Sequence, residues 1–352
     1  ALSKSDQLFV IARNSSFTYK GKPVKIQKVG RELGVRYVLE GSVLKSEDRV
    51  RISAQLIDAV KGDHLWAERY DRDLKDIFAL QDEITKKIIT ALHVELTDGE
   101  QVRIFAKRIE NIDTLLKMME AGSFWNKGTK ESTMRVGQLA QEIIAMEPES
   151  PGSYVWLGYY HLRLATFGMS PRENLTKCFE FAQKAVSLDE SIPDSHNLLG
   201  SAYLWMRQYE KAIAAGKRSI ELAPNGAISH RHLGYFLCYA GRVDEGITHC
   251  KQGIRLNPFP TQNDYMGLGI CYRVKGMYEE ALSEFKKALQ RSPDALNVNL
   301  LLTSTYALLD RQEEARAAAQ KVLEIDPDFS VERASKIWPY KNPADIKLGV
   351  DA

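Results

Sequence analysis

The sequence of 352 residues carries almost no net charge, because 48 lysines and arginines are balanced by 46 aspartates and glutamates. Proteins that bind nucleic acid or anionic membranes through charge usually show a clear excess of basic residues. The composition therefore predicts no nucleic-acid partner. No apolar run approaches the roughly 18 residues that a membrane-spanning helix needs, so the sequence predicts no membrane segment within this chain.

Cysteine is scarce, and its four copies lie apart from one another, with no CxxC pair. Each falls in a segment with helical spacing, which predicts buried free thiols in a reducing compartment. A cytoplasmic location is therefore expected, with the periplasm as the alternative. The cysteines are Cys178, Cys238, Cys250 and Cys271.

The motifs of common catalytic sites are also missing. The sequence has no GxxxxGK[ST] phosphate loop, no HExxH, no GxSxG and no dinucleotide-binding glycine pattern. His230 and His232 are two residues apart, and side chains at that spacing on a helix point in different directions. We therefore predict no metal site, no cofactor and no catalytic activity for this chain.

The first part of the chain has the pattern of a small α+β domain. Residues 8–12 form a short apolar run suited to a buried strand, and a polar loop is expected over 14–23. Helical spacing over 24–33 ends at Gly34, a natural helix stop. Three strand-like runs follow at 35–45, 49–58 and 63–70, joined by short turns, and predict an antiparallel meander with one face under the 24–33 helix.

A long helix is expected over 76–96, because Ile77, Leu80, Ile84 and Ile88 form an apolar stripe without internal glycine or proline. The predicted fold class is thus an α+β domain followed by an all-α superhelix. We expect the α+β domain over 1–97, shortened at its beginning, and a helical linker over 98–112. Six repeat-like units then fill 113–327, and a capping helix over 329–338 with a tail completes the segment 328–352.

One pattern returns about every 34 residues between Pro193 and Pro327. A Leu-Gly pair or leucine opens each unit, a small residue follows, and a proline closes it. The closing prolines at 224, 258, 293 and 327 are 34, 35 and 34 residues apart. This is the period of the tetratricopeptide repeat, in which two helices form a hairpin and hairpins stack. Two further units before Pro193 are irregular, and the second is expected to have a long inter-helix loop over 164–174.

The first helix of each such unit turns one face to the concave side of the superhelix. Its positions carry asparagine, arginine, tyrosine and apolar residues, which suit an extended peptide or a protein partner. A solvated face without a specific ligand is the alternative that these residues leave open. The candidate groove residues are Asn197, Ser201, Arg231, Tyr235, Asn263, Met266, Arg273 and Asn297.

Residues 9–92 resemble a known bacterial module, above all over Phe9–Gly21, Val29–Val43 and His64–Leu74. They are similar to the amino-terminal domain of the Tol-system β-propeller protein. In related proteins this module stands between a class III adenylate or guanylate cyclase domain, or a winged-helix DNA-binding domain, and a repeat array. The end of the chain, Asp326–Arg333 with Pro339–Asp345, looks like the repeat tail of the cyclase proteins.

This resemblance implies the regulatory part of a bacterial cyclase, with a peptide or protein in the repeat groove and a possible homodimer through the first domain. The alternatives are the periplasmic sensor of a winged-helix regulator and a free-standing assembly scaffold. The sequence departs from the related module in lacking a first strand, which predicts an exposed sheet edge. The chain begins at Ala1, within what looks like the end of a helix, so we expect a piece of a longer protein. It holds no positions that match a cyclase domain.

Overall fold

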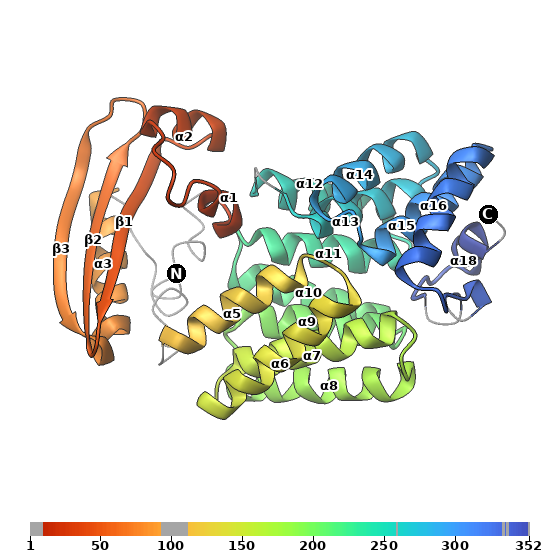
Figure 1. Cartoon of the computed structure of the whole chain (residues 1–352), viewed down its shortest axis with the longest axis horizontal. Helices are drawn as coiled ribbons and strands as arrows, with labels where there is room; N and C mark the ends of the chain where they lie inside the picture. Colours follow the sequence, from red (N-terminus) through yellow and green to blue (C-terminus); the bar gives the residue numbers. More distant parts are fainter. Residues whose placement is uncertain (1–9, 93–111, 258–259, 333–334, 336–337, 351–352) are drawn as a thin grey trace. The chain divides into compact units, whose positions relative to one another are not determined.

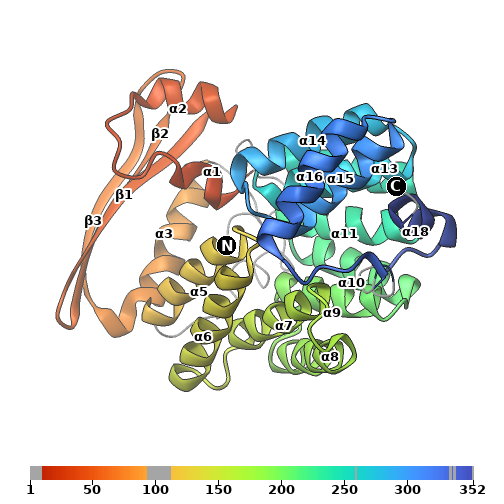
Figure 2. The same ribbon diagram turned by 45° about the vertical axis from the view of Figure 1, so that its right-hand side comes forward.

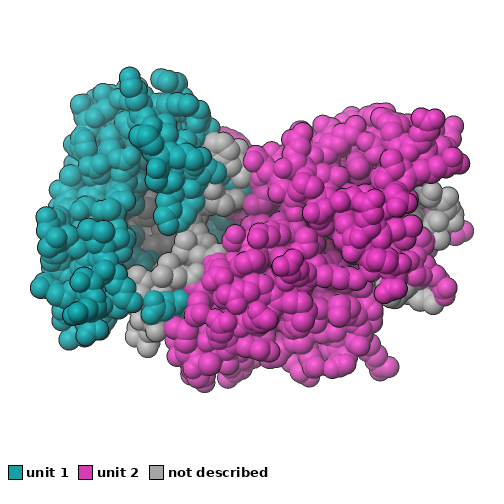
Figure 3. Space-filling model, viewed as in Figure 1, with its two compact units in different colours: residues 1–115, 223–226, 256–259 teal, residues 116–222, 227–255, 260–352 magenta. Residues whose placement is uncertain are grey.

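The structure is a computed structural model that describes residues 10–92, 112–257, 260–332, 335 and 338–350. Its residues fall into two compact units (Figure 3). Unit 1 contains residues 1–115 with the short segments 223–226 and 256–259, and unit 2 contains 116–222, 227–255 and 260–352. The predicted linker over 98–112 lies outside the described residues, except for residue 112.

Unit 1 is built on a three-stranded antiparallel sheet with the order β1-β2-β3 (Figure 1). The strands are β1 (Tyr37–Ser46), β2 (Arg49–Asp58) and β3 (His64–Asp73). Their register is regular apart from one irregularity between β2 and β3 at Leu56 and Ile57. This confirms the predicted meander. It could be predicted because the sequence shows alternating side chains and short turns.

Two helices cover this sheet: the expected helix before the strands, and the long helix after them, which the sequence left open to complete the α+β domain, to reach toward the repeats, or to do both. Helix α2 (Ile26–Leu33) forms as expected, ends at Gly34 in the left-handed conformation, and contacts β1. Helix α3 (Ile77–Ala91), which follows the 3₁₀ turn η2 (Leu74–Asp76), packs on β2 and β3. Its buried Leu80 and Ile88 supply the apolar stripe for that contact, so α3 as well as α2 completes the core of unit 1.

The segment before α2 differs from the prediction. Residues 10–12 form no strand, and residues 8 and 9 lie outside the described part of the chain. The expected polar loop contains a short helix, α1 (Arg13–Phe17). The Thr18 hydroxyl donates to the carbonyl oxygen of Ser15 at 2.8 Å. Such local bonds from serine and threonine favour a turn over an extended strand.

Unit 2 consists of helical hairpins (Figures 1 and 2). The described residues contain six of these hairpins, and the first of them begins at residue 112, just before unit 2. Each hairpin packs on the next, which confirms the predicted all-α superhelix. The pairs are α5 (Ile112–Trp125) and α6 (Lys130–Met146); α7 (Pro151–Thr166) and α8 (Pro171–Leu188); α9 (Pro193–Trp205) and α10 (Tyr209–Leu222); α11 (Ala227–Tyr239) and α12 (Val243–Arg255); α13 (Gln262–Val274) and α14 (Tyr278–Arg291); and α15 (Leu296–Leu308) and α16 (Gln312–Ile325).

The second repeat shows why its spacing is irregular. The prediction of a long loop over 164–174 was wrong, because the extra residues lengthen both helices. Helix α7 has 16 residues and α8 has 18, against 13 or 14 in the repeats that follow. Leu164 and Ala165 are buried and extend α7, while Pro171 starts α8, a position that proline tolerates well.

The last segment is only partly described. The predicted capping helix over 329–338 falls partly outside the described residues, and residues 331, 332 and 335 are helical. Residues 338–340 follow in irregular conformation. Helix α18 (Pro343–Val350) then forms within the segment that was expected to be a tail, and it packs against α15. None of the helices in the described residues combines the length and apolarity of a bilayer span.

Candidate functional site

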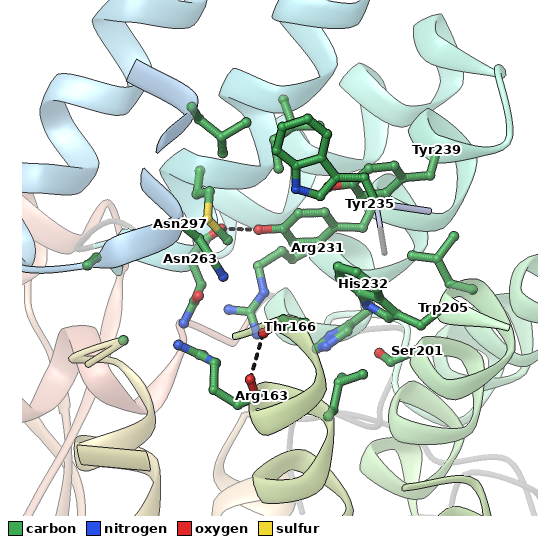
Figure 4. A pocket seen from close by; sticks show the side chains of 18 of the residues that line it. Arg163, Thr166, Ser201, Trp205, Arg231, His232, Tyr235, Tyr239, Asn263 and Asn297 are labelled. Atoms are coloured by element: carbon green, nitrogen blue, oxygen red, sulfur yellow. Dashed lines mark hydrogen bonds between the residues drawn. The ribbon is translucent and has the colours of Figure 1, made fainter. Parts of the chain in front are cut away.

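The concave side of the repeats forms a cavity of about 170 Å³. Its walls come mainly from the first helices of successive repeats, α7, α9, α11, α13 and α15 (Figure 4). Aromatic side chains dominate the wall, and polar groups interrupt it. The aromatic residues are Trp125, Tyr159, Trp205, Tyr235, Phe236, Tyr239, Trp338 and Tyr340.

One side of the cavity is closed by residues Asn126–Lys130 after α5, which we call the clasp loop. Asn263 on α13 donates from Nδ2 to Oδ1 of Asn126 at 3.1 Å, and the Ser292 hydroxyl donates to the carbonyl oxygen of Lys127. Lys130 donates from Nζ to Oδ1 of buried Asp326 at 2.7 Å. The clasp loop therefore ties the first repeat to the fifth and to the end of the sixth.

The C-terminal segment closes another part of the cavity. The ring of Tyr340 lies 4.7 Å from that of Tyr239 on α11, measured between centroids. The backbone nitrogen of Lys341 donates to the carbonyl oxygen of Tyr239 at 3.0 Å, and Arg207 donates from Nη2 to the carbonyl oxygen of Trp338 at 3.1 Å. The concave side is thus a partly enclosed chamber rather than an open channel.

Seven of the eight predicted groove residues line this cavity: Ser201, Arg231, Tyr235, Asn263, Met266, Arg273 and Asn297. The eighth, Asn197, is buried in α9 beneath the wall and is not part of the lining. Its Nδ2 is 3.5 Å from Oδ1 of Asp194 on the same helix.

Arg231 is held by an ion pair inside the wall. Its Nη1 donates to Oδ1 of Asp264 at 3.0 Å, and both side chains are buried. Burial opposes the charge of the guanidinium, but the attraction of Asp264 outweighs it and raises the pKa of Arg231. Asp264 also accepts from the backbone nitrogen and the hydroxyl of Thr261 and so caps α13. The charge of Arg231 is therefore already balanced.

Arg273 on α13 has no such partner. Its side chain lines the cavity, yet the residue is only 2% exposed. Its Nε and Nη2 atoms are buried and make no hydrogen bond with any described residue. Burial of a guanidinium without a compensating acceptor is unfavourable.

Arg163 on α7 is a further cation in the lining, one that the sequence analysis missed. Its guanidinium lies 3.7 Å from the ring centroid of Trp125, close enough for a cation–π contact. No carboxylate of the described residues lies within ion-pair distance of it. Burial lowers the pKa of Arg163 to about 10, so it remains charged at neutral pH. Figure 4 shows Arg163 and Arg231 reaching into the cavity.

The alignment of the repeats contains a signal for Arg163. Counted from the glycine of each Leu-Gly pair, Tyr159, Ser201 and Tyr235 hold the same position, one residue later. Arg163 lies five residues after Gly158, where Trp205 and Tyr239 lie in their own repeats. Candidate groove residues were taken from the four regular repeats alone, so the second repeat contributed none.

Neutral polar groups complete the lining. The Tyr235 hydroxyl donates to the carbonyl oxygen of Asn263 at 3.1 Å (Figure 4), and Gln262 donates from Nε2 to Oδ1 of Asn263 at 2.7 Å. His232 contributes its ring, with Nδ1 2.9 Å from the carbonyl oxygen of Ile228 and Nε2 3.3 Å from the Tyr159 hydroxyl. Part of this ring faces the cavity, but the surrounding protein lowers the pKa of His232 to about 3, with Arg231 as a second cause. His232 is therefore neutral at pH 7.

The groups for metal chemistry are not assembled in the described part of the chain, where no cluster of three His, Cys, Asp or Glu side chains could hold an ion. All four cysteines are free and buried, as predicted. Cys250 and Cys271 approach to 3.9 Å between their sulfur atoms in the core of the fourth and fifth repeats.

Comparison with known proteins identifies the repeats. Residues 193–225 and 275–335 each match the tetratricopeptide repeat family. The human IFIT1 dimer with m7Gppp-AAAA has a similar fold, with a TM-score of 0.53 and 14% identity, over 75% of this chain and 61% of that one. The chain thus contains tetratricopeptide repeats, the fold of many protein-interaction modules.

Two further proteins have a higher sequence identity to this chain than the IFIT1 structure does. A protein of Rhizobium meliloti (strain 1021) named "Putative adenylate cyclase 3" is 44% identical over 219 residues, which are 60% of this chain. Human anaphase-promoting complex subunit 7 is 30% identical over 132 residues, 37% of this chain and 23% of its own length. This chain spans 36% of the length of the Rhizobium meliloti relative.

Proposed function

We propose that this chain is the regulatory part of a bacterial adenylate cyclase and has no catalytic role of its own. The observation that carries the proposal is the 44% identity over 219 residues to a protein named as such an enzyme. Because the chain spans only 36% of that relative, a catalytic domain would lie in the remainder of the parent protein. The four buried free cysteines suit the reducing cytoplasm, where such an enzyme would meet ATP.

In this proposal the tetratricopeptide repeats receive the regulatory signal. A partner would bind on their concave side, where Asn263, Asn297 and Arg273 present polar groups among aromatic walls. Proteins and peptides are the usual partners of helical repeat arrays. A partner that binds one state of the cyclase more tightly shifts the enzyme toward that state. The size of the shift is set by the difference between the partner's affinities for the two states.

A second copy of the chain is the other partner that we propose. Strand β1 lies at one edge of the sheet, and most of its residues are exposed. Pairing of two such edges would join two parent proteins into a dimer. A change in this dimer could then alter the activity of the catalytic domains.

The test measures conversion of ATP to cyclic AMP by the full-length parent protein. Asn297→Trp would fill the cavity, and the exposed Arg218→Met on α10 serves as the control. If the cavity controls the enzyme, Asn297→Trp should change the activity by roughly 5-fold or more, a common size for coupling between sites, while Arg218→Met leaves it unchanged. A parent protein without cyclase activity, or equal activities of both variants and the native protein, would contradict the proposal.

A further inference from the structure

Basic groups outnumber acidic ones around the cavity of unit 2. The lining contains three arginines and, among the described residues, no aspartate, glutamate or lysine. Asp264, behind the wall, balances only Arg231. Burial raises the pKa of Asp345 and Arg273 opposes this rise, yet the two residues make no ion pair within 4.0 Å. Arg163 and Arg273 therefore line the cavity without an acidic partner among the described residues.

The unpartnered atoms of Arg273 form a particular edge of its side chain. Nε and Nη2 carry the parallel N–H groups of the guanidinium fork, which match the two oxygens of one carboxylate. Both atoms are buried and without a hydrogen-bond partner in the described residues. An acceptor is also missing for Arg163, whose flat face is covered by Trp125 at 3.7 Å.

The size and walls of the cavity limit what could supply the acceptor. About 170 Å³ is close to the volume of an engineered apolar cavity of about 150 Å³ that binds benzene. This space suits one ring with one charged group and is too small for several residues of an extended peptide. Trp125, Tyr159 and Tyr235 offer flat surfaces against which a ring could lie.

We propose that the cavity binds a small aromatic carboxylic acid, with its carboxylate beside the guanidinium of Arg273 and its ring between the aromatic walls. Arg163 adds a second positive charge to the same chamber, and the Oε1 atom of Gln262, buried without a partner, can accept from a polar ring substituent. This proposal rests on the proposed regulatory function but replaces a peptide partner in the cavity by a small ligand, because the space is too small for several residues of a peptide.

Benzoate is the probe that tests this assignment, and benzamide is its neutral counterpart of the same shape. Thermal unfolding of the whole chain would be followed at 10 mM of each compound, together with tryptophan fluorescence, because Trp125, Trp205 and Trp338 line the cavity. We expect benzoate to raise the unfolding midpoint and to change the fluorescence, and benzamide to do neither. Equal effects of both compounds, or no effect of benzoate, would overturn the proposal.

Arg273→Met tests the residue, and Arg218→Met on the exposed face of α10 is the matched control. We expect Arg273→Met to weaken benzoate binding at least tenfold in calorimetric titration, while Arg218→Met binds as the native chain does. If Arg273→Met does not fold, Gln262→Leu and Arg163→Gln take its place, each with an expected loss of benzoate binding. Unchanged binding in all folded variants would contradict the site, and a response to inorganic phosphate but not to benzoate would overturn the organic acid.

The same variants separate this proposal from the one on function. If the chain binds benzoate and loses that binding with Arg273→Met, the ligand site stands even where the cyclase activity of the parent protein does not respond. A parent protein whose activity responds to Asn297→Trp, in a chain that ignores benzoate, would keep the regulatory role and remove the aromatic acid.

Discussion

Single residues determine how closely the helices of a repeat approach each other. A methyl group at Gly234 on α11 would lie 2.5 Å from the sulfur of Cys250 and 3.0 Å from the carbonyl oxygen of Gly246. The carbonyl belongs to the backbone of α12 and cannot rotate away as a side chain could. The close crossing of α11 and α12 therefore depends on the missing side chain at this position.

Gly234→Ala should lower the free energy of unfolding by about 1–3 kcal/mol, the usual cost of an extra group in a packed core. Urea denaturation measures the change. The control is Gly122→Ala on α5, where the methyl group would meet Trp156 at an ordinary 3.6 Å. Because alanine favours a helix over glycine by up to ~1 kcal/mol, that variant should be as stable as the native chain or more so. Equal losses in both variants would contradict a role for the close crossing.

At this scale the sequence predicted much of the cavity wall. Arg231, Asn263 and Arg273 were recognised because the Leu-Gly pairs give the regular repeats a common register. Arg163 was missed because it lies in the irregular second repeat, from which no candidate groove residues were taken. The unpaired state of Arg273 could not be predicted, because it depends on which side chains of distant repeats come near, and sequence spacing does not contain that information.

Strand β1 lies at an edge of the sheet and carries exposed apolar side chains. Val43 is 58% exposed and Leu44 is 63% exposed, and in the described residues no strand pairs with the outer edge of β1. The opposite edge strand, β3, carries Arg69, Asp71 and Arg72. Charges of this kind discourage pairing between sheets, so pairing of two copies is expected at β1.

Leu44→Lys should shift the whole chain from dimer to monomer, because each copy would then carry a lysine on its exposed edge, and charges there discourage pairing. Light scattering over a tenfold range of concentration measures the molecular mass. The matched change on the other edge is Leu65→Lys on β3, a residue that is 44% exposed. It should leave the mass unchanged. A native chain that is monomeric throughout, or a dimer that survives Leu44→Lys, would refute pairing through β1.

Elements with strong local signals were predicted well, and those decided by distant contacts were not. The strands, α2 and the regular hairpins follow from alternation, Gly34 and the 34-residue period. The loop expected at 164–174 was wrong because Pro171 can begin a helix as well as interrupt one. The packing of α3 on β2 and β3 could not be predicted with certainty either. The sequence shows an apolar stripe on α3 but not which surface that stripe packs against.

At the scale of the repeat array, the clasp loop joins parts that are nearly 200 residues apart in sequence. Lys130 bonds Asp326 at 2.7 Å, and the Asp326 side chain is only 2% exposed. Removing the cation leaves a buried carboxylate with fewer partners, which is more costly than the loss of a surface ion pair. Lys130 itself is partly open to solvent, and this reduces the cost.

Lys130→Met should therefore lower the free energy of unfolding by on the order of 1–2 kcal/mol. Hydrogen exchange should also become faster in α5, α6 and α16, the helices next to the clasp loop. Lys177→Met, which removes an exposed ion pair with Glu173 at 2.6 Å within α8, should cost no more than about 0.5 kcal/mol. Similar effects of the two variants would show that the clasp loop does not hold the first and last repeats together.

A linear array of repeats can lose its outer hairpins one at a time, because each contacts only its neighbours. Here the contact of Asn126 with Asn263 joins the first repeat to the fifth, and that of Lys130 with Asp326 joins it to the end of the sixth, so neither end can fray without breaking such a bond. The same bonds close one side of the chamber, so a ligand that enters or leaves on that side has to break them. The rate at which they open would set how long a bound signal persists, and a weakly bound ligand could still have a long residence time.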